Sequence, residues 1–302
     1  MKNLELKGHL YALICVFIWG TTFISTKVLL QELTPIEILL IRFILGYIAL
    51  FLFYPKRLYV EDRKQEKYFI GAGICGVTLY FLLENIALTY TFASNVAIIL
   101  SVAPFFTALV SRFFLKDEEL SPNFFIGFIF ALIGIGIISF NGSSKFQLNP
   151  IGDVLAILAA IVWAFYSVIT KKISTFGYNT VQTTRRIFLY GLIFMIPTVL
   201  LMGFSVSLET ILNSTYLFNI IYLGFGASAL CFVIWNLSLK LIGPVKTSAY
   251  IYFSPVVTVI TSSIFLNEEI TPLMLLGVTL AVFGLIVSEY KKKNTRILEM
   301  RQ

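Results

Sequence analysis

The feature that most constrains this chain is a succession of ten apolar stretches, each long enough to cross a lipid bilayer as a helix. They cover residues 10–31, 35–54, 68–90, 93–115, 122–141, 151–173, 180–202, 215–240, 246–266 and 272–290. A spanning helix needs about 20 predominantly apolar residues. The chain is 58% hydrophobic and 13% charged, whereas soluble domains are about 25% charged. The sequence therefore predicts an all-α membrane protein with ten transmembrane helices.

The second half of the chain repeats the first. Residue types that seldom coincide by accident recur at offsets of 144 or 151 residues, as in the pairs Trp19/Trp163, Arg42/Arg186, Asn85/Asn236 and Pro104/Pro255. Each half holds five predicted helices, an odd number, so the second copy enters the membrane from the opposite side and the halves form an inverted repeat. We expect a first repeat at 1–141, a linker at 142–150, a second repeat at 151–290 and a basic cytoplasmic tail at 291–302.

The positions of the basic residues predict the orientation of these helices. The net charge is +7, and in the ten-helix arrangement 20 of the 23 Lys and Arg residues fall on one side, leaving Lys27, Arg42 and Lys145 on the other. Lys and Arg gather in cytoplasmic loops. We therefore expect a multipass protein of the plasma membrane with both termini in the cytoplasm. The basic charge then reports orientation and gives no reason to expect a nucleic-acid partner.

Glu84 is the sharpest candidate for chemistry inside the membrane. Placing an acidic group in hydrocarbon costs at least about 2.5–3.5 kcal/mol. Glu84 therefore either pairs with a neighbouring base or reaches the interface, or it serves to carry a proton or bind a cationic group. Tyr80 lies one turn earlier and shares its face. Two matched intramembrane charges, Arg42 and Arg186, either reach their interfaces by snorkelling or hold an anionic group. The sequence leaves both pairs of interpretations open.

Two further matched pairs have both a structural and a functional interpretation. Asn85 and Asn236 would either join helices through hydrogen bonds or line a transport pathway. Pro104 and Pro255 lack an amide hydrogen and are expected to kink their helices. The kinks would either serve packing or leave a carbonyl group available to a substrate.

The remaining candidate residues lie on small or aromatic helix faces. Ser101 belongs to a stripe of small residues, and the corresponding stripe in the second half carries Tyr250 and Ser254. Such stripes indicate close helix packing or exposure to a cavity. Trp163 and Tyr166 share one face of the sixth predicted helix, where they either pack in the core or form the walls of a site.

No pattern in the chain indicates an enzyme. There is no phosphate-binding loop of the Walker type and no HExxH sequence, and His9 is the only histidine. Cys15, Cys75 and Cys231 lie within apolar stretches without metal-ligand spacing. We expect no cofactor, no metal site and no catalytic residues.

With these features in place, the sequence resembles the EamA-type branch of the drug/metabolite transporter superfamily, from about Gly8 to Glu289. The resemblance rests on Trp19-Gly20, Arg42-Phe43, ENIALTYTFASNVAIILSVAPFFTALVSRFFLKDEEL from Glu84 and GPVKTSAYIYFSPVVTVITSSIFLNEEIT from Gly243. It implies a transporter whose third, fourth, eighth and ninth helices surround a central cavity and which works by alternating access, commonly as an exporter. Small multidrug-resistance relatives carry a membrane-embedded glutamate in their first helix. This chain has no acid there, so a proton-coupling role does not carry over.

The sequence as a whole predicts a secondary transporter that exports a small polar metabolite or amino acid. The substrate and the lipid bilayer are the expected partners, and a proton is the candidate coupling ion. A channel-like conduit and a non-transporting scaffold or receptor are the alternatives, which saturable flux and counterflow would exclude. Substrate identity, direction of net transport, coupling ion and oligomeric state stay open at this stage.

Overall fold

The computed structural model describes residues 2–90, 96, 99–115, 122–140, 149–257, 260–261 and 271–289, and every regular element in these ranges is helical. The first half holds α1 (Lys2–Leu29), α2 (Pro35–Phe53), η1 (Arg63–Gln65), α3 (Glu66–Gly73), η2 (Ile74–Leu79), α4 (Tyr80–Tyr90), α6 (Ala103–Phe114) and α7 (Pro122–Phe140). The second half holds α8 (Pro150–Ser174), α9 (Thr180–Met202), α10 (Leu208–Leu212), α11 (Ser214–Ile221), η3 (Tyr222–Leu230), α12 (Cys231–Ile242), α13 (Pro244–Ala249), η4 (Tyr250–Phe253) and α15 (Pro272–Glu289).

Within the described residues, six helical stretches are long and apolar enough to cross a membrane. They are Asn3–Leu29, Pro35–Phe53, Arg63–Tyr90, Pro150–Ser174, Thr180–Met202 and Ser214–Ile242, and shorter apolar helices cover Ala103–Phe114, Pro122–Gly134 and Leu275–Ser288. The described part of the chain is therefore all-helical, and its apolar helices are those of a multipass membrane protein. The predicted spans 93–115 and 246–266 lie partly outside the described residues, so ten spanning helices in two inverted repeats stay a prediction.

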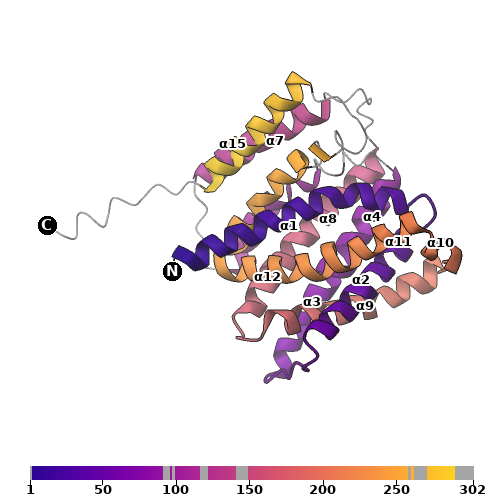
Figure 1. Ribbon diagram of the computed structural model, residues 1–302. Helices are drawn as coiled ribbons and strands as arrows, with labels where there is room; N and C mark the ends of the chain where they lie inside the picture. Colours follow the sequence, from indigo (N-terminus) through magenta and orange to yellow (C-terminus); the bar gives the residue numbers. More distant parts are fainter. Residues whose placement is uncertain are drawn as a thin grey trace.

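The helices form a main bundle and a separate pair. In Figure 1, α7 and α15 run side by side along one edge of the molecule, and the other long helices gather in the bundle. Glycine makes the contact within the pair close. A Cβ atom added to Gly134 would lie 2.5 Å from both Ala281 N and Gly277 O. Small residues of this kind let helix backbones approach one another in lipid, where no hydrophobic force drives association.

Polar side chains begin several of the helices. Asn149 Oδ1 accepts hydrogen bonds from Ile151 N and Gly152 N at the start of α8. At the start of α9, Asn179 Oδ1 accepts from the backbone N–H groups two and three residues further on. The Glu37 carboxylate accepts from Thr34 N and from Ser205 N, both at 2.8 Å. The asparagine contacts and the Thr34 contact satisfy backbone donors that a helix start leaves unpaired, and the Ser205 contact ties the segment between α9 and α10 to the start of α2.

Both halves depart from α-helical geometry at matched places. The π-helical stretches η2 and η3 end at Leu79 and Leu230, which are 151 residues apart. Ahead of the two matched prolines, a turn covers residues 101–102 and the 3₁₀ stretch η4 ends at Phe253. Pro104 is thus in the first turn of α6, where a missing amide hydrogen is tolerated, and not in the middle of a continuous helix 93–115.

Aromatic rings fill the centre of the main bundle. Phe43 on α2 lies at the middle of this packing, and its ring centroid is 5.2 Å from Phe81, 4.9 Å from Phe188 and 5.7 Å from Phe232. These side chains are buried, and their edge-to-face geometry is the preferred one for aromatic pairs. The ring cluster holds α2, α4, α9 and α12 together and borders the site described next.

Candidate functional site

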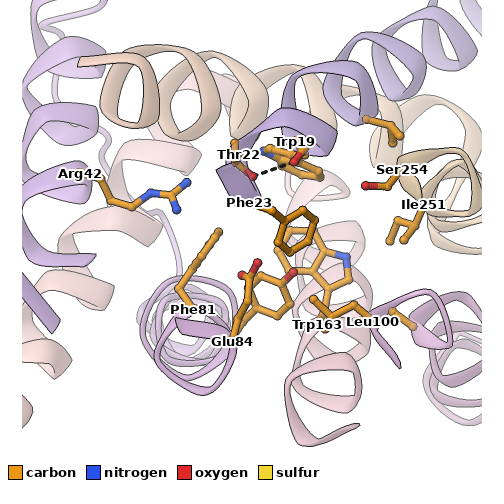
Figure 2. A pocket seen from close by; sticks show the side chains of 13 residues that line it. Trp19, Thr22, Phe23, Arg42, Phe81, Glu84, Leu100, Trp163, Ile251 and Ser254 are labelled. Carbon is orange, nitrogen blue, oxygen red and sulfur yellow. Dashed lines mark hydrogen bonds between the residues drawn. The ribbon is translucent and has the colours of Figure 1, made fainter. Parts of the chain in front are cut away.

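A cavity of about 60 Å³ lies inside the main bundle. One water molecule needs about 10–15 Å³ of such space, so several waters or a small ligand group can enter. The side chains around it, drawn in Figure 2, are Val16, Trp19, Thr22, Phe23, Arg42, Tyr80, Phe81, Glu84, Leu100, Ala103, Trp163, Ile251 and Ser254. They come from α1, α2, α4, α6, α8, η4 and the residues next to the two interrupted helices.

Arg42 supplies a cation to this cavity. The side chain is 3% exposed, its Nε donates to Ser228 Oγ at 3.0 Å, and its guanidinium carbon lies 4.4 Å from the centroid of the Phe81 ring. No other hydrogen bond of this guanidinium to a described residue is found. The ring contact partly replaces the lost hydration of the charge. The terminal nitrogens remain available to an acceptor inside the cavity.

Glu84 supplies an anion to the same cavity. It is 7% exposed, and within the described structure its Oε2 has no hydrogen-bond partner. The Arg42 guanidinium and the Tyr80 hydroxyl line the same cavity and interact electrostatically with the carboxylate. Among the described residues, the ion pairs within 4.0 Å are Arg186–Glu66 and Lys246–Glu5. Glu84 and Arg42 are therefore held apart, and each can receive an opposite charge.

The three tryptophans of the chain gather beside these charges. The Trp19 ring centroid lies 5.5 Å from that of Trp163 and 4.8 Å from that of Trp235. Trp19 Nε1 donates to Ala227 O at 3.0 Å, whereas Trp163 Nε1 has no partner in the described structure. The cavity thus combines one cation and one anion with aromatic walls.

The structure brings together five of the predicted site residues, which are Arg42, Tyr80, Glu84, Trp163 and Ser254. They lie on α2, α4 and α8 and just after η4. Their convergence depends on how these helices pack against one another. It combines residues that are far apart in the sequence.

The two matched asparagines do not line the cavity. Asn85 Nδ2 donates to Pro35 O at 3.3 Å, which ties α4 to the start of α2. Asn236 Oδ1 accepts from the Tyr166 hydroxyl at 2.7 Å, and its Nδ2 donates to Thr184 Oγ1 at 3.0 Å. These contacts join α12 to α8 and α9, so Asn85, Asn236 and Tyr166 have helix-joining contacts in this structure.

Other predicted residues also lie outside the cavity lining. Ser101 is fully buried, and Pro104 and Pro255 are buried as well. The Tyr250 hydroxyl is hydrogen-bonded to His9 Nδ1 at 2.8 Å, near the start of α1. A role for these residues in substrate binding stays a prediction.

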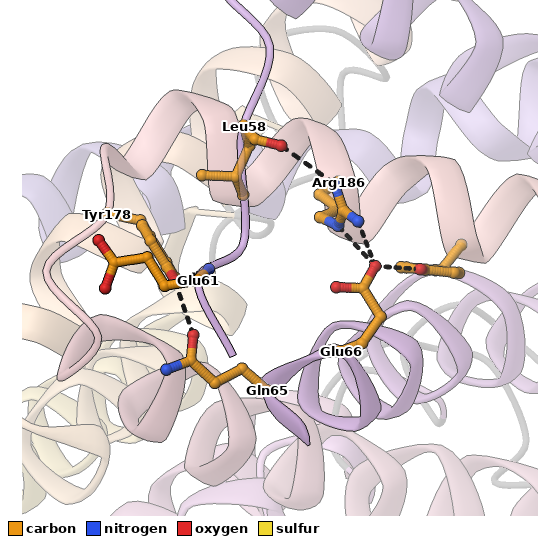
Figure 3. A network of polar contacts seen from close by, with 7 residues as sticks. Leu58, Glu61, Gln65, Glu66, Tyr178 and Arg186 are labelled. Carbon is orange, nitrogen blue, oxygen red and sulfur yellow. Dashed lines mark hydrogen bonds and ion pairs between the residues drawn. The ribbon is translucent and has the colours of Figure 1, made fainter. Parts of the chain in front are cut away.

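Arg186, the counterpart of Arg42, lies in a separate polar network (Figure 3). Its guanidinium donates to the Glu66 carboxylate and, at 3.3 Å, to Leu58 O, while the Tyr190 hydroxyl donates to the same carboxylate. Tyr178 extends the network by donating to Gln65 Oε1 at 2.7 Å. Arg186 is thus already neutralised by Glu66, and it fastens the segment between α2 and α3 to α9.

Some cavity residues are not among those that the sequence predicts. Phe23 lies four residues after Trp19 on α1, so a helical face through Trp19 would have indicated it. Phe81 follows Tyr80 directly and has no polar group that would single it out. Ser228, the hydrogen-bond partner of Arg42, lies in the π-helical stretch η3, and no signal in the sequence predicts that stretch or this contact.

The fold and this cavity define a class of protein: a multipass helical membrane protein with a charged, aromatic-walled cavity enclosed in its bundle. The chain belongs to the EamA-like transporter family, whose sequence profile matches residues 6–140 and again residues 150–290. The resemblance to the drug/metabolite transporter superfamily is thereby confirmed. The family and its named members indicate a transporter and not an enzyme.

Individual relatives agree with this assignment. An uncharacterized transporter of Archaeoglobus fulgidus is 27% identical over 95% of this chain and 98% of its own length. A probable amino-acid metabolite efflux pump of Escherichia coli is 22% identical over 94% of this chain and 95% of its own length. A solved crystal structure superposes with a TM-score of 0.77 over 100% of this chain and 99% of that chain at 19% identity, which is evidence for the fold alone.

Proposed function

We propose that the protein is a secondary transporter that exports a small zwitterionic metabolite of the amino-acid type. The observation that carries the proposal is the pair Arg42 and Glu84, which face one cavity without forming an ion pair with each other. An ionisable residue inside a membrane protein is costly, and such residues usually mark a substrate or ion pathway. Two opposite charges held apart match the carboxylate and the ammonium group of one small molecule.

Arg42 and Glu84 each have the functional group needed to bind one end of a zwitterion. The planar guanidinium of Arg42 can bind a carboxylate through two parallel hydrogen bonds. Glu84 Oε2, buried without a partner among the described residues, can accept from an ammonium group, with the Tyr80 hydroxyl beside it. The name of the Escherichia coli relative, a probable amino-acid metabolite efflux pump, supports this substrate class.

Alternating access is the mechanism that this arrangement supports best. The cavity is enclosed by elements from both halves, and the helix interruptions at residues 101–102 and in η4 lie next to its lining residues Leu100, Ile251 and Ser254. Interrupted helices beside a binding site are typical of secondary transporters built from inverted repeats. We expect the protein to lie in the plasma membrane with both termini in the cytoplasm. We expect transport to be outward, with a proton as the candidate coupling ion.

Counterflow in proteoliposomes tests the proposal. Proteoliposomes that contain the purified protein are loaded with an unlabelled compound, and uptake of the same compound in labelled form is measured. Three compounds are compared: a zwitterionic amino acid, its decarboxylated amine and its deaminated acid. We expect saturable counterflow for the zwitterion and much weaker exchange for both partial molecules. Flux that never saturates would identify a conduit, and exchange of the amine alone would exclude the role given to Arg42.

A further inference from the structure

A buried hydrogen-bond donor at the cavity has no acceptor within the described residues. Trp163 is 4% exposed and lines the cavity, yet its Nε1 is buried without a partner in the described part of the chain. In folded proteins about 90% or more of buried polar groups are paired, so each exception needs a reason. Seven buried side-chain atoms of the described residues lack a partner, and two of them, Glu84 Oε2 and Trp163 Nε1, belong to cavity-lining residues.

The matched tryptophan of the first half has a structural bond instead. Trp19 lies 144 residues before Trp163, and its Nε1 donates to Ala227 O at 3.0 Å, which joins α1 to η3. Trp163 packs against Tyr166 and Tyr80, with ring centroids 4.9 Å and 4.7 Å away, and no described residue accepts a hydrogen bond from its Nε1. Since the two positions are equivalent in the repeat, the free donor of Trp163 reflects a difference in role.

The free donor and the charged pair lie on different sides of the cavity. In Figure 2 the indole nitrogen of Trp163 points toward Ile251 and Ser254, away from Arg42. A zwitterion anchored at Arg42 and Glu84 would extend its side chain toward that nitrogen. Leu100 and Ile251, which border this side, belong to the segments where the helices are interrupted, so a substrate can gain access there when these segments move.

We propose that Trp163 is a specificity-determining residue whose indole N–H donates to an acceptor atom on the substrate's side chain. The transporter would then prefer zwitterions with a side-chain amide or hydroxyl over hydrocarbons of the same shape. A site with a buried polar group rejects the analogue that leaves the group unpaired. The inference rests on the proposed function, because it presumes that the charged pair holds the zwitterionic end.

Isosteric substrates test this inference in proteoliposomes. Asparagine is compared with leucine, and threonine with valine, because each pair differs mainly in a side-chain acceptor. We expect the wild-type protein to favour the polar member, and Trp163→Phe to lower that preference in kcat/KM about tenfold, which corresponds to about 1.4 kcal/mol. Trp163→His, which keeps a ring N–H, should restore part of the preference.

Trp235→Phe is the matched control. Trp235 is fully buried, and its Nε1 also lacks a partner among the described residues, but it does not line the cavity. It should leave the substrate preference unchanged. Equal preferences in wild type and Trp163→Phe would overturn the inference while leaving the proposed function intact. Absence of counterflow for every zwitterion would instead overturn the proposed function.

A second measurement does not depend on the folding of a Trp163 variant. In wild-type protein labelled with ¹⁵N-tryptophan, the three tryptophans give three indole N–H resonances, which Trp19→Phe and Trp235→Phe assign by elimination. Saturating asparagine should move the Trp163 resonance downfield, as hydrogen bonding does, and leucine should move it much less. A resonance that responds equally to both amino acids would exclude the proposed hydrogen bond.

Discussion

Arg42 and Arg186 show how the same residue at matched positions acquires different roles. Arg186 is paired with Glu66 beside the segment between α2 and α3. Arg42 has a single hydrogen bond to described residues, from Nε to Ser228, and lies at the cavity. A paired charge contributes to structure. The free-energy cost of desolvating a buried charge without an ion-pair partner can instead be offset by an anionic group of a ligand.

The two arginines should respond differently to replacement by lysine. Arg42→Lys keeps the charge but removes the planar, two-pronged donor, so the KM for a zwitterionic substrate should rise about tenfold with little change in Tm. Arg186→Lys should lower Tm and leave KM unchanged. Counterflow kinetics and thermal unfolding in detergent measure both quantities. Identical effects of the two substitutions on KM would contradict the assignment of Arg42 to the site.

Glu84→Gln tests the carboxylate in the same way. The amide preserves the shape of the side chain and removes its charge, so transport of a zwitterion should fall at least about tenfold because the ammonium group loses its counter-charge. If Glu84 also carries the coupling proton, the remaining flux should no longer depend on pH. Glu37→Gln is the control, since Glu37 is a buried carboxylate bonded to Thr34 and Ser205. Glu37→Gln should reduce Tm without changing substrate affinity. If Glu84→Gln retains pH-dependent flux, proton coupling through Glu84 is excluded.

At the scale of elements, the close pair α7 and α15 differs from the bundle that holds the cavity. A Cβ added to Gly127 would lie 2.4 Å from Gly284 O, and one added to Gly284 would lie 2.5 Å from Ala131 N. Contacts with backbone atoms cannot relax by a change of rotamer. The two helices are therefore packed backbone to backbone, whereas the interrupted segments next to the cavity are the places where the helical hydrogen bonds are already incomplete.

Two glycines of α7 provide a matched test of this packing. Gly134→Ala would place a methyl group 2.5 Å from backbone atoms of α15, while nothing lies within 4 Å of the corresponding position at Gly136. Overpacking costs about 1–3 kcal/mol, so Gly134→Ala should lower Tm by several degrees. Gly136→Ala should leave Tm unchanged or raise it slightly, because alanine favours helix. Equal Tm values for the two variants would show that the α7–α15 contact does not limit stability.

At the scale of the whole molecule, the family profile matches each half of the chain separately, as expected for a duplicated unit. Six described stretches are long enough to span the membrane, and the basic residues predict which side each loop faces. The predicted topology places the segment between α2 and α3 in the cytoplasm and the segment between α9 and α11 outside.

Labelling of single cysteines tests that orientation. The exposed residues Arg57 and Asn213 lie in the two loops, and each is replaced by cysteine in turn. A membrane-impermeant maleimide added to intact cells should label Asn213→Cys, and it should label Arg57→Cys only after permeabilisation. The native cysteines are free, with Cys15 and Cys231 buried and Cys75 half-buried, and the unsubstituted protein supplies the background. Labelling of both variants from outside would exclude the predicted topology.

The sequence by itself determined the membrane class, the apolar stretches and the family. Hydropathy and repeated residues are local properties, and lipid requires each spanning segment to satisfy its own backbone. Pairing of polar side chains was decided only by the tertiary structure: Glu84 and Arg42 meet at a cavity, Asn85 and Asn236 join helices, and Trp163 keeps the donor that Trp19 uses. In lipid, apolar residues surround a helix on all sides, so hydropathy does not say which face turns inward; packing and close glycine contacts make that choice.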